Sequence, residues 1–234
     1  MPSLSPTPEP RRTRPRALVF DFDGTLVDSR IDFPLMRERV LVHLSAWGLK
    51  PDPAVEMLIL ETIHWARKNL RATSPLRADQ YFAEAMALLW EIERPFCNQA
   101  RLFPGVADAL RAAATAGVSL GIITRNSRAG VGLVMARNPL PIAVIVTRDD
   151  LMDVKPHPRH LLQALQAMDV PAAQTWLIGD HPTDVACGLA AGAHAGAVLT
   201  GGTPAAALLA AGAELVCPDS ASLVHALLRP SAGE

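Results

Sequence analysis

Two aspartates separated by one residue, Asp21 and Asp23, lie in the segment DFDGTL that follows the apolar run 17–20. Alternate side chains of an extended chain point the same way, so both carboxylates face one side. Such a pair can share a divalent cation, or divide the roles of nucleophile and proton donor. Gly24 permits a tight turn whose backbone amides can hold a phosphate. The alternative is a strand ending in an Asp-Gly turn, with Asp21 capping a helix.

Two further polar positions follow apolar runs later in the chain. The hydroxyl of Thr124, with the amides of Arg125 and Asn126 after it, can hold phosphoryl oxygens. An ordinary helix cap by Thr124 or Asn126 is the alternative. Lys155 precedes Pro156, which favours an extended lysine backbone and so helps to aim the side chain.

A second pair of carboxylates, Asp180 and Asp184, follows the apolar segment 176–178. The first lies where a strand would end, and the second lies near a helix start. Hard oxygen ligands suit Mg²⁺, which takes one or two protein carboxylates and keeps waters or a substrate phosphate. The alternative is that both acidic side chains only complement the dipole of a helix N-terminus.

These residues need a scaffold that brings separate strand ends together. Short apolar runs alternate with Ala- and Leu-rich segments of helical length, which is typical of a doubly wound α/β domain with a mostly parallel, Rossmann-like sheet. Ligands of such sheets gather at the carboxyl ends of the strands. The predicted strands are 17–20, 118–124, 142–147, 175–179, 196–199 and 214–216, with helices at 106–116 and 159–168.

Residues 33–98 break this alternation, because they contain helical patterns and no strand-like run. We predict an inserted α-helical cap domain at 33–98, within a core domain made of 16–32 and 99–234. Residues 1–15, rich in Pro and Arg, are predicted to be a disordered tail. The helical patterns of the insertion cover 34–47, 53–70 and 78–93.

The composition excludes several classes of protein. Half of the 234 residues are hydrophobic and 19% are charged, which excludes disorder for the chain as a whole. A net charge of -1 gives no broad field for nucleic acid or an anionic membrane. Three cysteines without a CxxC pair indicate neither a disulfide framework nor a zinc site, and a cytoplasmic location fits best. Because of the near-zero net charge, we expect no nucleic-acid and no membrane partner.

Together, the motifs DFDGTL, Thr124, Lys155 and GDHPTD resemble, in this order, those of the haloacid dehalogenase-like hydrolases with a helical cap after the first motif. The resemblance covers about residues 17–218. It implies that Asp21 attacks phosphorus to form an aspartyl-phosphate. It also implies that Asp23 protonates the leaving alcohol and then activates water.

The same resemblance implies the remaining roles. Mg²⁺ would be bound by Asp21, Asp180 and the backbone carbonyl of Asp23, with Asp184 reached through water or lying behind these ligands. Lys155 would neutralise the transferring group, and a substrate-binding set would comprise Gly24, Thr124, Arg125, Asn126 and Lys155. Arg125 has no firm counterpart in the family, so contact with substrate and exposure to solvent are both open for its side chain.

Three other activities use similar residues. A phospho-receiver module also places aspartates, Thr and Lys around Mg²⁺, but DxDGT and the helical insertion do not resemble one. A haloacid dehalogenase would need neither Asp23 nor a metal. A sugar-phosphate mutase of the same fold would use the same residues and is harder to reject, because the difference lies in how the cap excludes water.

The insertion also bears on the substrate. A cap closing over the strand ends would exclude large substrates, which favours a small phosphomonoester over a phosphoprotein or a nucleic acid. Arg67 and Arg71, four residues apart on one helix, can meet a second anionic group or only complement the helix dipole. The family makes phosphoglycolate the leading substrate hypothesis, and a monomer or homodimer is expected. A histidine metal site at His157, His160 and His181 is not expected, and helix capping is favoured for His181.

Overall fold

The computed structural model describes residues 14–50 and 57–229, in two compact units. The core unit takes in the chain through Asp28, then Leu102–Asn126, then the part from Asn138 onward. The helical unit consists of Ser29–Arg101 and Ser127–Arg137. The tail predicted at 1–15 lies almost wholly outside the described residues, as does the start of the helix predicted at 53–70. The domain boundaries at 33 and 98 stay a prediction.

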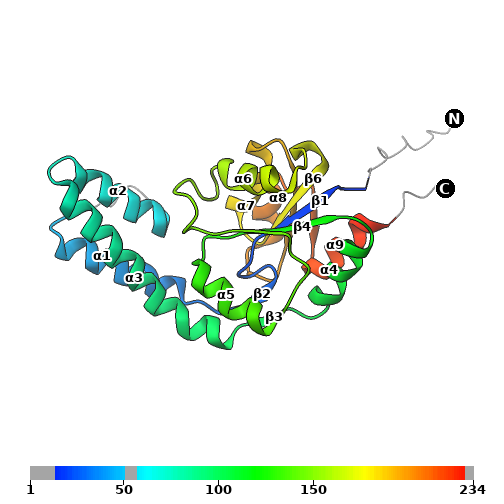
Figure 1. Ribbon diagram of the computed structural model, residues 1–234, viewed down its shortest axis with the longest axis horizontal. Helices are drawn as coiled ribbons and strands as arrows, with labels where there is room; N and C mark the ends of the chain where they lie inside the picture. The colour runs from blue at the N-terminus through cyan, green and yellow to red at the C-terminus, as the bar shows by residue number, and fades with distance from the viewer. Residues whose placement is uncertain (1–13, 51–56, 230–234) are drawn as a thin grey trace. The chain divides into compact units, whose positions relative to one another are not determined.

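In the described part of the chain, six strands of the core unit form one parallel sheet in the order β5-β4-β1-β6-β7-β8 (Figure 1). This confirms the predicted Rossmann-like α/β class. The residues of β1 and β6 are buried throughout, as expected of strands covered on both faces. The strands are β1 (Ala17–Phe20), β4 (Ser119–Ile123), β5 (Val144–Val146), β6 (Thr175–Gly179), β7 (His194–Val198) and β8 (Leu215–Cys217).

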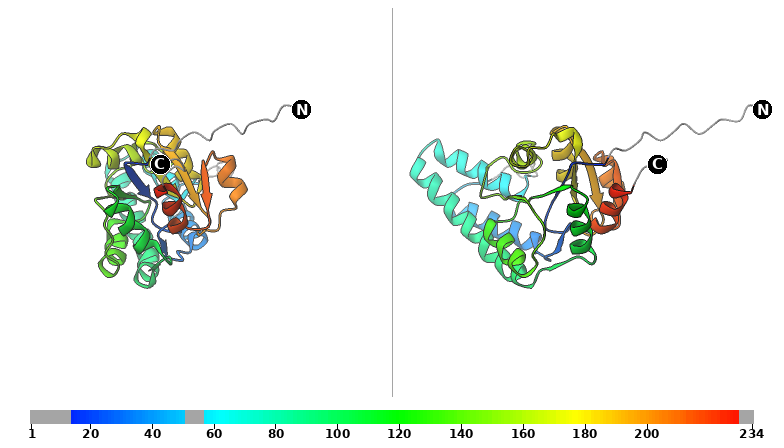
Figure 2. Two further views of the ribbon diagram at one scale, coloured as in Figure 1. Left: turned by 90° about the vertical axis from the view of Figure 1, so that its right-hand side faces the viewer. Right: turned by 45° about the vertical axis from the view of Figure 1, so that its right-hand side comes forward.

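Helices cover both faces of this sheet. α4 (Val106–Thr115) and α9 (Ser220–Leu228) pack against each other on one face, as the right-hand view of Figure 2 shows. The opposite face carries α6 (Arg159–Met168), α7 (Pro182–Ala190) and α8 (Ala205–Ala210). A short 3-10 helix, Ala172–Gln174, leads into β6.

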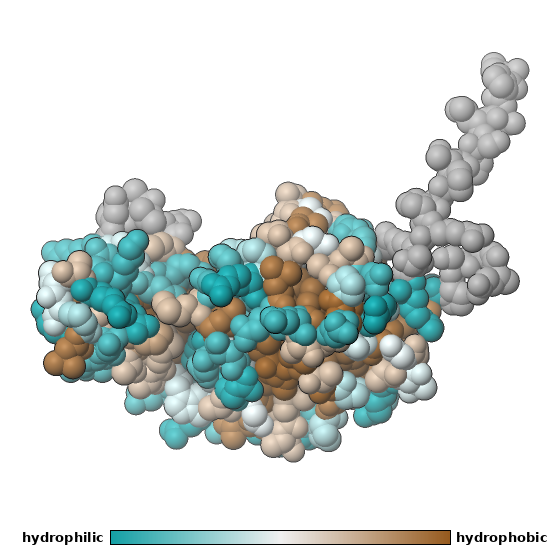
Figure 3. All heavy atoms as spheres, turned by 45° about the horizontal axis from the view of Figure 1, so that its top comes forward, coloured by the Kyte–Doolittle hydropathy of each residue, from teal (hydrophilic) through white to brown (hydrophobic). Residues whose placement is uncertain are grey.

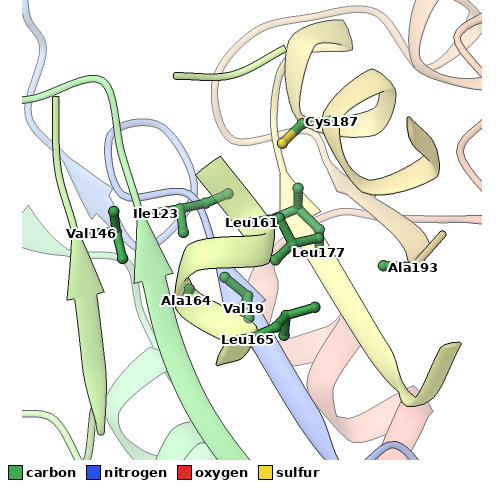
Figure 4. Packing of buried hydrophobic residues seen from close by; sticks show 9 residues of the cluster. All are labelled: Val19, Ile123, Val146, Leu161, Ala164, Leu165, Leu177, Cys187 and Ala193. Atoms are coloured by element: carbon green, nitrogen blue, oxygen red, sulfur yellow. The ribbon is translucent and has the colours of Figure 1, made fainter. Parts of the chain in front are cut away.

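The face under α6 and α7 is filled by aliphatic side chains. Leu161 and Leu165 of α6 lie against Val19 of β1 and Leu177 of β6, and all four are buried (Figure 4). Burying a Leu or Val side chain contributes about 1.5–3 kcal/mol relative to leaving it exposed. This packing fixes α6 on the sheet close to the strand ends.

The register of the sheet aligns three strand ends. Phe20 of β1 pairs with Ile122 of β4 on one side and with Ile178 of β6 on the other. Asp21 therefore follows directly after the aligned row, and Thr124 and Asp180 each follow two residues after it. Since the strands are parallel, all three side chains emerge at one edge of the sheet.

The helical unit contains α1 (Phe33–Ala46), α2 (Ile59–Arg71), α3 (Pro75–Gln99) and α5 (Arg128–Arg137). α3 is longer than the predicted 78–93 and runs through Pro95, although proline lacks an N–H and usually ends a helix. Its last turns are held by packing against α5 and by Arg137, which donates to the carbonyl of Cys97 at 2.6 Å. Tertiary contacts therefore outweigh the local cost of the proline.

The remaining strands, β2 (Val27–Asp28) and β3 (Arg101–Leu102), form a small two-stranded sheet.

Hydrophobic residues also reach the surface of the core unit, and brown areas are visible there in Figure 3. Single exposed apolar side chains are normal for a folded chain. The large exposed apolar residues of the core unit are Met152, Leu162, Leu189, Leu199 and Leu209.

No helix in the described ranges combines the length and the apolar character needed to cross a membrane.

Candidate active site

A buried lysine lies between two carboxylates at the carboxyl edge of the sheet. The ammonium nitrogen Nζ of Lys155 is 2.6 Å from Oδ1 of Asp21 and 2.6 Å from Oδ1 of Asp184. The Lys155 side chain is 2% exposed, the Asp184 side chain 1% and the Asp21 side chain 13%. Asp21 is thus the member of this group that solvent, or a substrate, can reach most easily.

Asp180 joins these residues to make an acidic cluster. One carboxylate oxygen from each of Asp21, Asp180 and Asp184 lies within 4.8 Å of the other two. The three carboxylates face one ammonium, so the group carries two surplus negative charges when all four are ionised. A divalent cation with hard oxygen ligands would balance that surplus. The three carboxylates therefore fit a divalent cation such as Mg²⁺, and a ligand role for the backbone carbonyl of Asp23 stays a prediction.

The pKa values show the same crowding of negative charge. Burial raises the pKa of Asp21 well above its usual value, Lys155 opposes the shift, and Asp184 and Asp180 add to it. The pKa of Asp180 is raised to about 6, first by burial and then by the charge of Asp184. Burial alone would lower the pKa of Lys155, but Asp184 and Asp21 outweigh burial and raise it. The lysine is therefore a fixed positive charge inside an acidic site.

The turn after the first aspartate is built around Gly24. Its φ of +79° lies in the left-handed region, and a Cβ at this position would be 2.7 Å from Oδ2 of Asp180. Both facts require glycine. Next to it, the hydroxyl of Thr25 donates to Oδ1 of Asp180 at 2.8 Å. The first and fourth motifs are therefore in direct contact.

The second carboxylate of the first motif, Asp23, is oriented by Asn126. The Asn126 amide nitrogen Nδ2 donates to Oδ2 of Asp23 at 2.9 Å. The backbone N–H of Asn126 in turn donates to Oγ1 of Thr124 at 3.0 Å, a local turn bond that lies before α5 and does not cap it. The sequence indicates Asn126 as a phosphate ligand, and the structure gives its side chain a contact with Asp23.

The Arg125 side chain has a different contact from the two that the sequence left open. Its Nη1 donates to the backbone carbonyl of Lys155 at 2.6 Å. Substrate binding by Arg125 and by the rest of the predicted phosphate-binding set stays a prediction.

Two hydroxyl residues that the sequence analysis did not single out hold the Gly24-Thr25 turn. Thr200 donates to the carbonyl of Gly24 at 2.5 Å, and Ser220 donates to the carbonyl of Thr25 at 2.7 Å. Next to Thr200, a Cβ on Gly201 would lie 1.7 Å from Oδ2 of Asp180. Thr200 and Gly201 lie in the loop after β7, and Ser220 is the first residue of α9. No motif in the sequence marks these residues, although both segments follow predicted strands.

The histidine of the fourth motif is a helix cap, as favoured from the sequence. His181 is the N-cap of α7, and its Nδ1 accepts from the backbone N–H of Thr183 at 3.2 Å. Oδ2 of Asp184 accepts from the backbone N–H of His181 at 3.0 Å, which completes a capping box. Asp184 therefore caps α7 with Oδ2 and pairs with Lys155 through Oδ1.

In the helical unit, Arg67 is engaged by its own neighbours. Its Nη2 is 2.7 Å from Oδ1 of Asp79, and its guanidinium lies 4.3 Å from the ring centre of Phe82. These contacts fix the guanidinium between α2 and α3. The sequence offers two roles for Arg67, binding of an anionic substrate group and complementing the helix dipole. An ion pair with Asp79 is neither of these.

Comparison with known proteins decides the family. The sequence profile of the haloacid dehalogenase-like hydrolases matches residues 18–198, most of the chain. The chain belongs to the haloacid dehalogenase-like hydrolases. Among curated relatives of this hydrolase, a phosphoglycolate phosphatase from Xanthomonas campestris is 32% identical over 194 residues, covering 80% of this chain and 84% of the relative.

A second relative of the hydrolase, a plasmid-encoded phosphoglycolate phosphatase from Cupriavidus necator, is 29% identical over 227 residues, covering 92% of this chain and 94% of the relative. Among solved structures, a hydrolase from Pseudomonas syringae superposes with a TM-score of 0.68 at 22% identity, covering 91% of this chain and 97% of that one. At that identity the superposition supports the fold alone.

Proposed function

We propose that this hydrolase is a Mg²⁺-dependent phosphatase that acts on a small phosphomonoester through an aspartyl-phosphate on Asp21. The observation that carries the proposal is the pairing of Lys155 with Asp21 and Asp184 beside Asp180. Phosphoryl transfer depends mainly on positioning and charge neutralisation, and this arrangement supplies both.

The first half-reaction uses both carboxylates of the first motif. A carboxylate oxygen of Asp21 forms a bond to phosphorus while the bond from phosphorus to the ester oxygen breaks. Asp23 gives its proton to that leaving oxygen, which departs as an alcohol. Lys155 stabilises the charge on the phosphoryl oxygens, and Asn126 keeps Asp23 oriented.

The second half-reaction restores the enzyme. Asp23, now a carboxylate, takes a proton from water as the water oxygen bonds to phosphorus. The bond from phosphorus to Asp21 breaks, and inorganic phosphate leaves. Mg²⁺, held by Asp21, Asp180, the backbone carbonyl of Asp23 and Asp184, directly or through water, would supply positive charge against the phosphoryl oxygens.

The names of the relatives support phosphoglycolate as the first substrate to test. Phosphoglycolate carries a carboxylate besides its phosphate. Of the two arginines considered for that charge, Arg67 already pairs with Asp79. Phosphate release should be measured with Mg²⁺ on a panel of phosphorylated organic acids and sugars, and isomer formation followed in parallel. Phosphate release supports the phosphatase, and isomer formation without phosphate release would overturn it.

Removal of divalent metal should abolish turnover, and added Mg²⁺ should restore it. The reason is that Asp21, Asp180 and Asp184 face a single ammonium, that of Lys155, so two negative charges remain unbalanced when all four groups are ionised. These charges repel an incoming phosphate unless a cation is present. Activity should be measured after exhaustive chelation and again after Mg²⁺ is returned. Full activity in the chelated, dialysed enzyme would contradict the proposed metal.

Substitution of Gly201 by alanine should lower kcat by at least about 10-fold, because a displacement of about 1 Å near the chemistry can cost 10²-fold. The added Cβ would lie 1.7 Å from Oδ2 of Asp180, so that carboxylate must move. Gly132→Ala is the matched control, since its Cβ would meet no atom within 4 Å in α5. Wild-type kcat and Mg²⁺ affinity in Gly201→Ala would show that the placement of Asp180 is not needed.

A further inference from the structure

The lysine of the site is held by its backbone as well as by its ammonium group. The N–H of Lys155 donates to Nδ1 of His160 at an N···N distance of 3.1 Å. On the other side of the same residue, the carbonyl of Lys155 accepts from Nη1 of Arg125 at 2.6 Å. His160 has no exposed surface, and Lys155 has 1%. Both polar groups of the Lys155 main chain are thus fixed in a buried environment.

The contacts of His160 determine where its proton lies. A backbone N–H can only donate, so Nδ1 must carry a lone pair towards Lys155. Nε2 lies 3.2 Å from the carbonyl oxygen of Val146, which can only accept, so Nε2 carries the hydrogen. A protonated imidazole would place a second N–H against the N–H of Lys155. The pKa of His160 is lowered to about 3, chiefly by burial and next by the charge of Lys155, which supports a neutral ring.

The helix that carries His160 is itself fixed. His160 is the second residue of α6, whose Leu161, Ala164 and Leu165 are buried in the cluster over the sheet (Figure 4). Val146 is the last residue of β5. His160 therefore connects three elements: the Lys155 loop, the start of α6 and the end of a sheet strand.

We propose that His160 is a positioning residue of the active site, whose neutral imidazole ties the backbone of Lys155 to the end of β5. This rests on the proposed function, because Lys155 is the group it places. A lysine side chain has a flexible four-carbon stem, so its ammonium is placed well only if its backbone is also fixed. With the N–H bond to His160 lost, the loop can shift and move Nζ away from Asp21 and Asp184.

Three variants test the role through turnover. His160→Leu removes both hydrogen bonds, whereas His160→Asn keeps an acceptor near the position of Nδ1. His157→Leu is the control, because His157 is exposed in the same loop and its Nδ1 accepts from the N–H of Arg159 instead. We expect kcat to fall about 10- to 100-fold in His160→Leu, with a smaller change in KM. His160→Asn should recover most of that loss, and His157→Leu should stay at the wild-type kcat.

An NMR measurement tests the geometry without turnover. In the wild-type protein, long-range ¹H–¹⁵N spectra should show Nε2 protonated and Nδ1 unprotonated between about pH 5 and pH 8, where an ordinary histidine titrates. Amide hydrogen exchange at Lys155 should rise in His160→Leu and not in His157→Leu. A ring that titrates in that range, or carries its proton on Nδ1, would overturn the proposal.

The two proposals can fail separately. If wild-type protein releases no phosphate from any ester but the NMR results hold, the proposed phosphatase function fails while the His160 contact stands. If wild-type protein turns over and folded His160→Leu keeps both the wild-type kcat and the wild-type exchange at Lys155, the positioning role fails. A variant that loses stability and activity equally, with no recovery in His160→Asn, also overturns it, since that pattern describes a purely structural residue.

Discussion

Asp21→Asn should abolish phosphate release, with a loss of about 10⁴-fold or more, because an amide is a poor nucleophile and a weaker metal ligand than a carboxylate. The fold should survive the change. Asparagine has nearly the same shape, and its neutral amide relieves the repulsion from Asp180 and Asp184. We therefore expect thermal unfolding at or above the wild-type temperature together with loss of turnover.

The control for Asp21→Asn is Asp108→Asn, which makes the same chemical change at an exposed carboxylate of α4. It should turn over like the wild type. Initial rates should be measured with Mg²⁺ on the best ester from the substrate panel, with circular dichroism to confirm folding. Near wild-type turnover by Asp21→Asn would refute the aspartyl-phosphate pathway.

Asp23→Asn should slow turnover of alkyl phosphates by about 10²- to 10⁴-fold, the usual contribution of a general acid or base. The new amide can keep its place, since its oxygen still accepts from Nδ2 of Asn126. The effect should depend on the leaving group. p-Nitrophenolate hardly needs a proton, so transfer to Asp21 should be affected less than the hydrolysis that follows.

A fast transfer to Asp21 followed by slow hydrolysis predicts a burst of p-nitrophenol release in the first turnover. Rapid mixing of Asp23→Asn with p-nitrophenyl phosphate should release about one equivalent of p-nitrophenol and then continue slowly, which is the kinetic sign of a covalent intermediate. Mass spectrometry of the quenched protein should find phosphate on Asp21. Equal losses for activated and unactivated esters, with no burst, would show that Asp23 is not the acid.

The sequence predicts the sheet well, and it predicts which side chains lie at the carboxyl edge of the sheet, because those side chains follow strand ends. Asp21, Thr124 and Asp180 each follow a buried apolar run, and the parallel register brings the ends of those runs together. Because ligands gather at this edge of a parallel sheet, locating the strand ends also locates the candidate ligand-binding side chains. The helix α6 was predicted with the bounds that the structure has, because its apolar spacing and Pro158 mark it clearly.

Hydrogen bonds from distant side chains to the backbone of the site could not be predicted. Thr200 and Ser220 are 176 and 195 positions from the residues they hold, and a hydroxyl that donates to a backbone carbonyl leaves no pattern in the chain. The sequence offers His160 only as a metal ligand, which its spacing does not favour, because a bond from a backbone N–H to an imidazole also leaves no pattern in the chain. Pro95 shows the opposite limit, because a strong local rule was overridden by packing.

The bond from Ser220 to Thr25 has a consequence for biosynthesis. Asp21 emerges from the ribosome early. The turn beside it is complete only when the start of α9 has also emerged, so that Ser220 can reach Thr25. Asp180 and Thr200, which touch the same turn, also arrive late. Because the chain is made from its N-terminus, the nascent chain holds an unfinished site until Ser220 has emerged. Catalytic competence should therefore be acquired only after that point, and chains stalled before residue 220 should be inert towards phosphorylated metabolites.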